Sequence, residues 1–75
     1  MEGLFIKQSK IEKIQSEEIY KWNLMVTAKE LYGPDHELTN RDTKDWSQLF
    51  SMMQILEIPV LYTHPERILH KKKDG

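Results

Sequence analysis

The stretch from Ser16 to Gly33, SEEIYKWNLMVTAKELYG, constrains this chain most, because its apolar residues recur at helical spacing on two different faces. Ser16 and the two glutamates after it are typical of a helix start, and Gly33 followed by Pro34 is typical of a helix end. A helix that is apolar around most of its circumference must be covered on two sides. We therefore expect this helix to run through the middle of a small core. Its two apolar faces carry Ile19, Trp22, Met25 and Val26, and Tyr20, Leu24, Ala28 and Leu31, respectively.

A second helix is predicted from about Thr43 to Glu57, where apolar residues follow the spacing of a single helix face. The Ile58-Pro59 pair ends it, because the residue before a proline avoids the helical region. The polar run from Pro34 to Asp42 is predicted to be a loop between the two helices. We expect the helices to pack through Trp22, Met25 and Val26 of the first against Trp46, Leu49, Phe50 and Met53 of the second.

Shorter elements are expected toward both ends of the chain. The capping-box pattern from Ser9 to Glu12 predicts a short helix from about Lys10, which merges with the next helix or breaks near Gln15 and Ser16. A similar pattern from Thr63 to Glu66 predicts a last short helix from His64 or Pro65. The β-prone runs Leu4–Ile6 and Val60–Tyr62 can pair as a minor two-stranded element, and residues 71–75 are expected to form a frayed tail. The predicted fold class is therefore mainly α, with three to four helices in a small domain.

The composition is that of one small folded domain. The chain has 75 residues, of which 39% are hydrophobic and 31% charged, and it contains no cysteine, so no disulfide stabilises it. The N-terminal residues lack the basic and long apolar regions of a signal peptide, and no apolar run is long enough to cross a bilayer. We therefore predict a single domain over residues 1–75, a cytoplasmic location and no membrane partner.

No pattern in the sequence indicates catalysis or a bound cofactor. The three glycines are isolated, so there is no loop to hold a phosphate, and no serine lies in the context of a nucleophile. The histidines His36, His64 and His70 lack the spacing of a zinc site. The acidic residues between positions 35 and 45 do not match a calcium loop and fit helix caps better. We predict that the protein is not an enzyme and binds neither a cofactor nor a metal.

The leading functional hypothesis is a small protein-interaction module, a regulator or inhibitor that binds a larger protein or a second copy. The chain is rich in tyrosine, tryptophan and methionine, which are enriched at protein interfaces. Tyr20 and Leu24 on the first helix, and Met52 and Ile55 on the second, lie off the stripes that pack the helices together. These four residues are the predicted partner-binding residues.

A helical nucleic-acid-binding protein is the alternative. Residues 58–75 have a net charge of +2, and Arg67, Lys71, Lys72 and Lys73 are its candidate phosphate contacts. The helix predicted from Thr43 to Glu57 carries Lys44 as its only cation, which argues against a recognition helix.

One short segment resembles a known family of DNA-binding domains. The run LFSMMQ at residues 49–54, followed by IPV at residues 58–60, is similar to a stretch of ARID-type domains. The similarity covers less than a quarter of the chain, and the later helices and glycine-containing end of that family's pattern are absent. No residue role is carried over from it.

Overall fold

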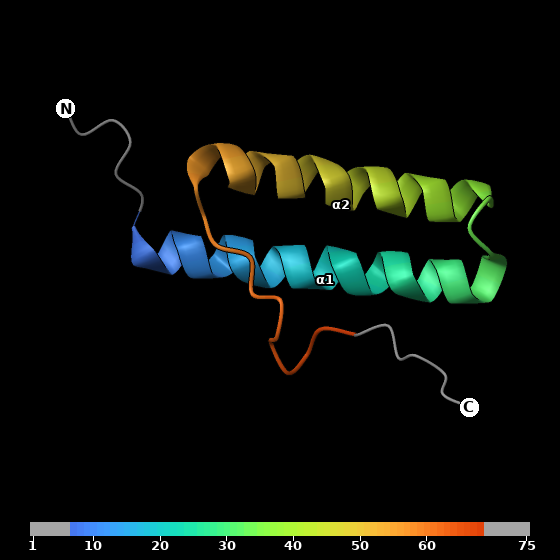
Figure 1. Ribbon diagram of the computed structural model, residues 1–75, viewed down its shortest axis with the longest axis horizontal. Helices are drawn as coiled ribbons and strands as arrows, with labels where there is room; N and C mark the ends of the chain where they lie inside the picture. Colours follow the sequence, from blue (N-terminus) through green and yellow to red (C-terminus); the bar gives the residue numbers. More distant parts are fainter. Residues whose placement is uncertain (1–6, 69–75) are drawn as a thin grey trace.

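The computed structural model describes residues 7–68, which form a hairpin of two antiparallel helices crossed by an extended segment (Figure 1). Helix α1 spans Gln8–Tyr32 and helix α2 spans Glu37–Leu56. Residues 58–68, here named the strap, leave the end of α2 and lie against α1. The prediction of a mainly α fold is confirmed, whereas the prediction of three to four helices is wrong, because residues 7–68 contain two helices and no strand.

Helix α1 is continuous over 25 residues, so the short helix predicted from about Lys10 merges with the next one, as the first of the two alternatives had it, and the break near Gln15 and Ser16 does not occur. Neither Ser9 nor Ser16 caps a helix start, because both lie inside α1, and the residue before the helix, Lys7, makes no side-chain cap. The physical reason is visible at Gln15. Its side chain is buried and its amide nitrogen donates a hydrogen bond of 2.9 Å to the carbonyl oxygen of Pro59, so the strap supports the helix at the predicted break.

The two helices are joined by a short turn, and the long loop predicted from Pro34 to Asp42 is wrong. Helix α2 already begins at Glu37, after Nδ1 of His36 accepts the backbone N–H of Leu38 at 3.0 Å. A histidine is outside the usual set of capping residues, which is why the sequence pattern did not reveal this start. Gly33 has a φ of 94°, a conformation that glycine adopts without strain, and its N–H bonds to the carbonyl of Lys29.

Helix α2 ends close to the predicted position, with Leu56 as its last residue. Glu57 follows in the left-handed conformation, with φ 61° and ψ 36°. The N–H of Ile58 donates to the carbonyl of Met53 at 2.9 Å, and the N–H of Glu57 donates to that of Gln54 at 3.1 Å. This pair of bonds is the Schellman motif, in which glycine is the usual left-handed residue. A glutamate therefore holds a strained position at the start of the strap.

The last short helix predicted from His64 or Pro65 is wrong within the described residues, where the chain makes turns and then lies along α1. The N–H of Arg67 bonds to the carbonyl of His64, but the turn does not continue. Side chains of α1 occupy the backbone groups that a longer helix would need, because the carboxamide of Asn23 bonds both Glu66 and Ile68.

The described residues also do not form the predicted β element. Val60–Tyr62 forms no strand, and Leu4–Ile6 lies outside the described residues. The frayed tail predicted for residues 71–75 lies outside them as well.

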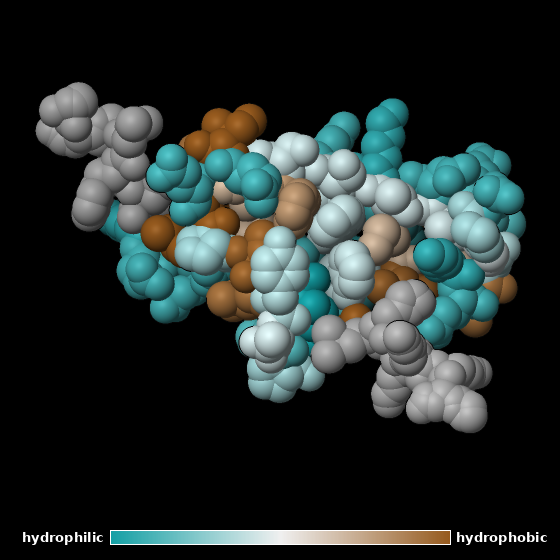
Figure 2. All heavy atoms as spheres, viewed as in Figure 1, coloured by the Kyte–Doolittle hydropathy of each residue, from teal (hydrophilic) through white to brown (hydrophobic). Residues whose placement is uncertain are grey.

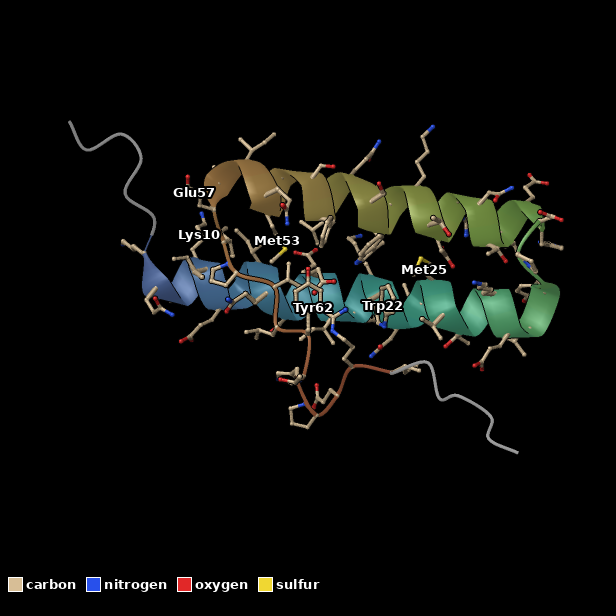
Figure 3. All side chains as sticks on the ribbon, viewed as in Figure 1. Lys10, Trp22, Met25, Met53, Glu57 and Tyr62 are labelled. Atoms are coloured by element: carbon tan, nitrogen blue, oxygen red, sulfur yellow. The ribbon has the colours of Figure 1, made fainter. Side chains whose placement is uncertain are left out.

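The apolar core is small and lies between the helices and beneath the strap. Figure 3 shows Met25 and Met53 between α1 and α2, and Met53 is fully buried. The predicted contact of Trp22 with Trp46 is confirmed, with ring centroids 5.3 Å apart in an edge-to-face arrangement. The buried apolar residues are Ile19, Val26, Ala28, Met53 and Ile58. Such a core covers α1 on two sides, by α2 and by the strap, and no other segment of residues 7–68 covers its third side.

Candidate interaction surface

The most deeply buried polar group is the carboxylate of Glu18, in the middle of α1. Its side chain is 0% exposed. One carboxylate oxygen accepts a hydrogen bond of 2.7 Å from the indole N–H of Trp46 on α2, and the other forms an ion pair with the guanidinium of Arg67 in the strap. A charge taken out of water in this way is tolerated only when it is paired and hydrogen-bonded. Glu18 therefore joins both helices and the strap at one point.

The guanidinium of Arg67 has three further contacts besides Glu18. Its Nε donates a hydrogen bond of 3.0 Å to the carbonyl of Leu61, within the strap itself. Its central carbon lies 5.3 Å from the ring centroid of Trp22 and 5.8 Å from that of Tyr62, both within cation–π range. Figure 3 shows Tyr62 and Trp22 on the side of α1 where the strap runs.

This placement bears on the nucleic-acid alternative, in which Arg67 was a candidate phosphate contact. The residue is 7% exposed and its charge is matched by Glu18, so it fastens the strap and does not face solvent. The other three candidates, Lys71, Lys72 and Lys73, lie outside the described residues.

The Glu18 site was missed from the sequence, although a signal for it was present. Glu18 falls within a stripe that otherwise holds Ile11, Ile14, Trp22 and Met25, at spacings of three, four and seven residues. A glutamate at such a position is either a break in the apolar face or a buried charge that needs a cation. A helix that starts at Ser16, as predicted from the sequence, places Glu18 in its first turn, where a carboxylate interacts favourably with the helix dipole and needs no buried cation.

Side chains of α1 hold the strap mostly through hydrogen bonds to the backbone of the strap. The indole N–H of Trp22 donates to the carbonyl of Ile68 at 2.7 Å, and the side chain of Asn23 donates to the carbonyl of Glu66 and accepts the N–H of Ile68, both at 2.9 Å. Gln15 holds the other end of the strap through Pro59. The side of α1 that the strap covers is thus closed by the chain itself.

A second side of the hairpin is open and carries large apolar side chains. We name it the open face. Leu24 and Leu31 follow Tyr20 by four and eleven residues, so these three residues share one face of α1. Met52 and Leu56 are four residues apart and share one face of α2. The members of the open face, with their exposed fractions, are Tyr20 (62%), Leu24 (42%) and Leu31 (69%) on α1, and Met52 (37%) and Leu56 (39%) on α2.

The two parts of the open face lie on the same side of the hairpin, as one ion pair shows. Nζ of Lys21 lies 3.8 Å from a carboxylate oxygen of Asp45. Asp45 is seven residues from Met52, so both lie on one stripe of α2. Lys21 lies on α1 between the side that faces α2 and the stripe of Leu24. The ion pair therefore places the stripe of Met52 and the stripe of Leu24 on the same side of the hairpin. The residues that hold the strap, including Trp22 and Asn23, lie on another side of α1.

Three of the four predicted partner-binding residues, Tyr20, Leu24 and Met52, therefore belong to one surface. Ile55, the fourth, is 80% exposed and follows Met52 by three residues, so it lies next to the open face on α2, but its side chain points away from α1. Leu31 and Leu56 belong to the open face but were not predicted, because further helices were expected to cover the chain. Figure 2 shows the side with the strap, where hydrophobic side chains gather near the end of α2 and mostly hydrophilic ones lie toward the turn.

Residues 7–68 contain neither a cluster of metal-ligating side chains nor a helix that could span a membrane. No three histidine, aspartate or glutamate side chains come together there as a metal site would require. His36 and His64 each accept a backbone N–H two residues ahead, so both serve local turns. Neither α1 nor α2 combines the length and the hydropathy that a bilayer-spanning helix needs.

Comparisons with protein-family models, with curated proteins and with solved structures find no match to this chain. The functional interpretation therefore rests on the residues and geometry described above.

Proposed function

We propose that this protein is a small non-enzymatic interaction module, a regulator or inhibitor that acts by docking its open face on another polypeptide. The observation that carries the proposal is the exposure of Tyr20, Leu24 and Leu31 along one side of α1. Large apolar side chains exposed along one side of a helix often mark an interaction site, even on a monomeric protein. Tyrosine, methionine and leucine side chains on a rigid helix also supply contact area without the entropic cost of ordering a loop.

The proposal explains a contrast within α1. One side of this helix is closed by the strap through several specific hydrogen bonds, and another is closed by α2. The third side carries residues of the same size and apolar character, but no segment among residues 7–68 covers it. A helix with two apolar faces, of which only one is covered within residues 7–68, is typical of a helix that is buried on two sides in a larger assembly.

A photo-cross-linking experiment in the native cells tests the proposal. A benzophenone amino acid replaces Leu31 on the open face, and a control places the same group at Ser51, which is exposed on α2 outside the open face. We expect a discrete cross-linked polypeptide from position 31 and none from position 51. Equal, diffuse labelling from both positions would contradict the proposal.

The nucleic-acid alternative now depends on the three lysines from Lys71 to Lys73, since Arg67 is paired with Glu18. A salt titration with DNA and RNA distinguishes the two functions, because phosphate contacts give an affinity that falls steeply with salt.

A further inference from the structure

We infer that the polypeptide which covers the open face is a second copy of this chain, so that two hairpins form a two-layered, four-helix assembly. The inference rests on the proposed function, namely that the open face is an interaction surface, and it names the partner. Three observations carry it: the single layer of helices, the area of the apolar surface and the balance of charge around it.

The first observation is the layering. Small domains normally bury their apolar faces between two packed layers of secondary structure. Residues 7–68 supply only one layer of two helices, with the strap along one side of α1. A second hairpin laid on the open face supplies the missing layer and gives α1 a neighbour on its third side. Homodimers with twofold symmetry are the commonest assemblies of this kind, and they need one surface that fits itself.

The second observation is the area. The exposed surface of the five open-face residues, added together, equals that of about two and a half fully exposed side chains. At roughly 150 to 200 Å² for each side chain of this size, the open face offers about 400 to 500 Å² of apolar surface. A standard interface buries about 800 Å² on each partner, of which somewhat more than half is apolar, or about 450 Å². The open face therefore matches what one partner contributes to a stable dimer.

The third observation is the charge. By helical spacing, charged residues of both signs border the open face: Lys10, Lys13, Glu17 and Lys21 on α1, and Arg41, Asp42 and Asp45 on α2. Four are positive and three negative, so the border is close to neutral, and Lys21 is already paired with Asp45. Two identical faces can therefore meet without net repulsion, which a strongly charged face could not do. Ile55 lies beside this face, next to Met52, and its side chain points away from α1.

Sedimentation equilibrium of the full 75-residue chain tests the inference. The concentration runs from about 1 µM to 1 mM, which spans weak to moderate dissociation constants. We expect a dimer at the upper end of the range. The double variant Leu24→Glu/Leu31→Glu should be monomeric throughout, whereas Ile55→Glu, which places the same charge outside the open face, should dimerise within about twofold of the wild-type affinity. Circular dichroism shows whether each variant keeps its helices, and Met52→Lys provides a milder change to the same face.

Two results would overturn the inference, and they separate it from the proposed function. A wild-type chain that stays monomeric at every concentration, together with a cross-link from position 31 to a different protein, removes the second copy but keeps the interaction module. A monomeric chain with no specific cross-link removes both. A dimer that survives Leu24→Glu/Leu31→Glu and is lost with Ile55→Glu places the interface elsewhere and also overturns the inference.

Discussion

The pairing of Glu18 with Arg67 should be the strongest single coupling in the fold, and a double-mutant cycle measures it. Glu18→Leu leaves a buried guanidinium without its carboxylate, and Arg67→Met leaves a buried carboxylate with only the indole of Trp46. Each hydrogen bond to a charged group contributes about 1.5 to 3 kcal/mol. Glu18 makes two, so we expect each single change to lower the free energy of unfolding by about 3 to 5 kcal/mol, the range seen when one partner of a buried pair is removed.

The double variant Glu18→Leu/Arg67→Met should be more stable than either single variant. It removes both charges together and leaves the indole N–H of Trp46 without an acceptor, which costs about 1 to 3 kcal/mol. The carbonyl of Leu61 also loses the Nε donor of Arg67, but this bond is only partly buried. The costs of the single changes therefore should not add. A domain of this size has only about 3 to 5 kcal/mol of stability, which one of these changes alone would remove, so the cycle is measured in the Glu57→Gly background described below with a stabilising osmolyte such as trimethylamine N-oxide added.

Urea unfolding followed by tryptophan fluorescence reports on this site directly, because Trp22 and Trp46 both contact it. Amide exchange at Ile68, whose N–H is bonded to Asn23, shows whether the strap detaches before the helices unfold. The exposed pair Lys21–Asp45, at 3.8 Å, is the control, and its removal by Lys21→Met should change stability by no more than about 1 kcal/mol. Single changes that add within about 0.5 kcal/mol in the double variant would refute the reasoning.

Other substitutions test the turns and the strap. Glu57→Gly should raise the free energy of unfolding in urea by about 0.5 to 1 kcal/mol, because it relieves a left-handed glutamate at φ 61°, and an unchanged midpoint would argue against strain there. Gly33→Ala should lower the free energy of unfolding by about 1 to 3 kcal/mol through backbone strain alone, because an added Cβ meets no atom within 4 Å. Pro34→Ala, which leaves Gly33 unchanged, is the control. An unchanged free energy of unfolding in Gly33→Ala would contradict the prediction. Asn23→Ala should speed amide exchange at Ile68 by at least tenfold while exchange in the middle of α2 stays unchanged, and uniform acceleration would show that the strap is not a separate unit.

The helical parts of the fold follow from the sequence where the signal is local. The apolar spacing from Trp46 to Leu56 predicts α2, and the pair Gly33-Pro34 predicts the end of α1, as observed. The start of α2 was placed too late because its first turns are polar. Asn40 and Arg41 are exposed there, whereas the hydroxyl of Thr39 is buried and lies 2.8 Å from the carbonyl oxygen of Gly33. A polar segment with Thr39 as its one buried residue has the sequence pattern of a loop.

The strap could not be predicted because its partners are distant in the chain. Arg67 and Glu18 are 49 residues apart, and Trp22 and Ile68 are 46 residues apart. The local sequence pattern at residues 63–66 favours a capped helix. In the structure, hydrogen bonds from side chains of α1 to the backbone of the strap outweigh this local preference. The candidate interaction surface was predicted in part, since Tyr20, Leu24 and Met52 are exposed on one side. Leu31 and Leu56 were missed because their exposure depends on how few segments cover the hairpin.

The central claim, that the open face is covered by a second copy, is tested most directly by isotope-filtered NMR on a mixed sample. One half of the protein carries ¹³C-labelled methyl groups and the other half is unlabelled, so that filtered NOEs report contacts between copies only. We predict intermolecular NOEs at the methyl groups of Leu24, Leu31 and Met52 from the ring of Tyr20, and none at Ile55. Intermolecular NOEs confined to Ile55 or to the strap, or none at all at about 1 mM protein, would contradict the account.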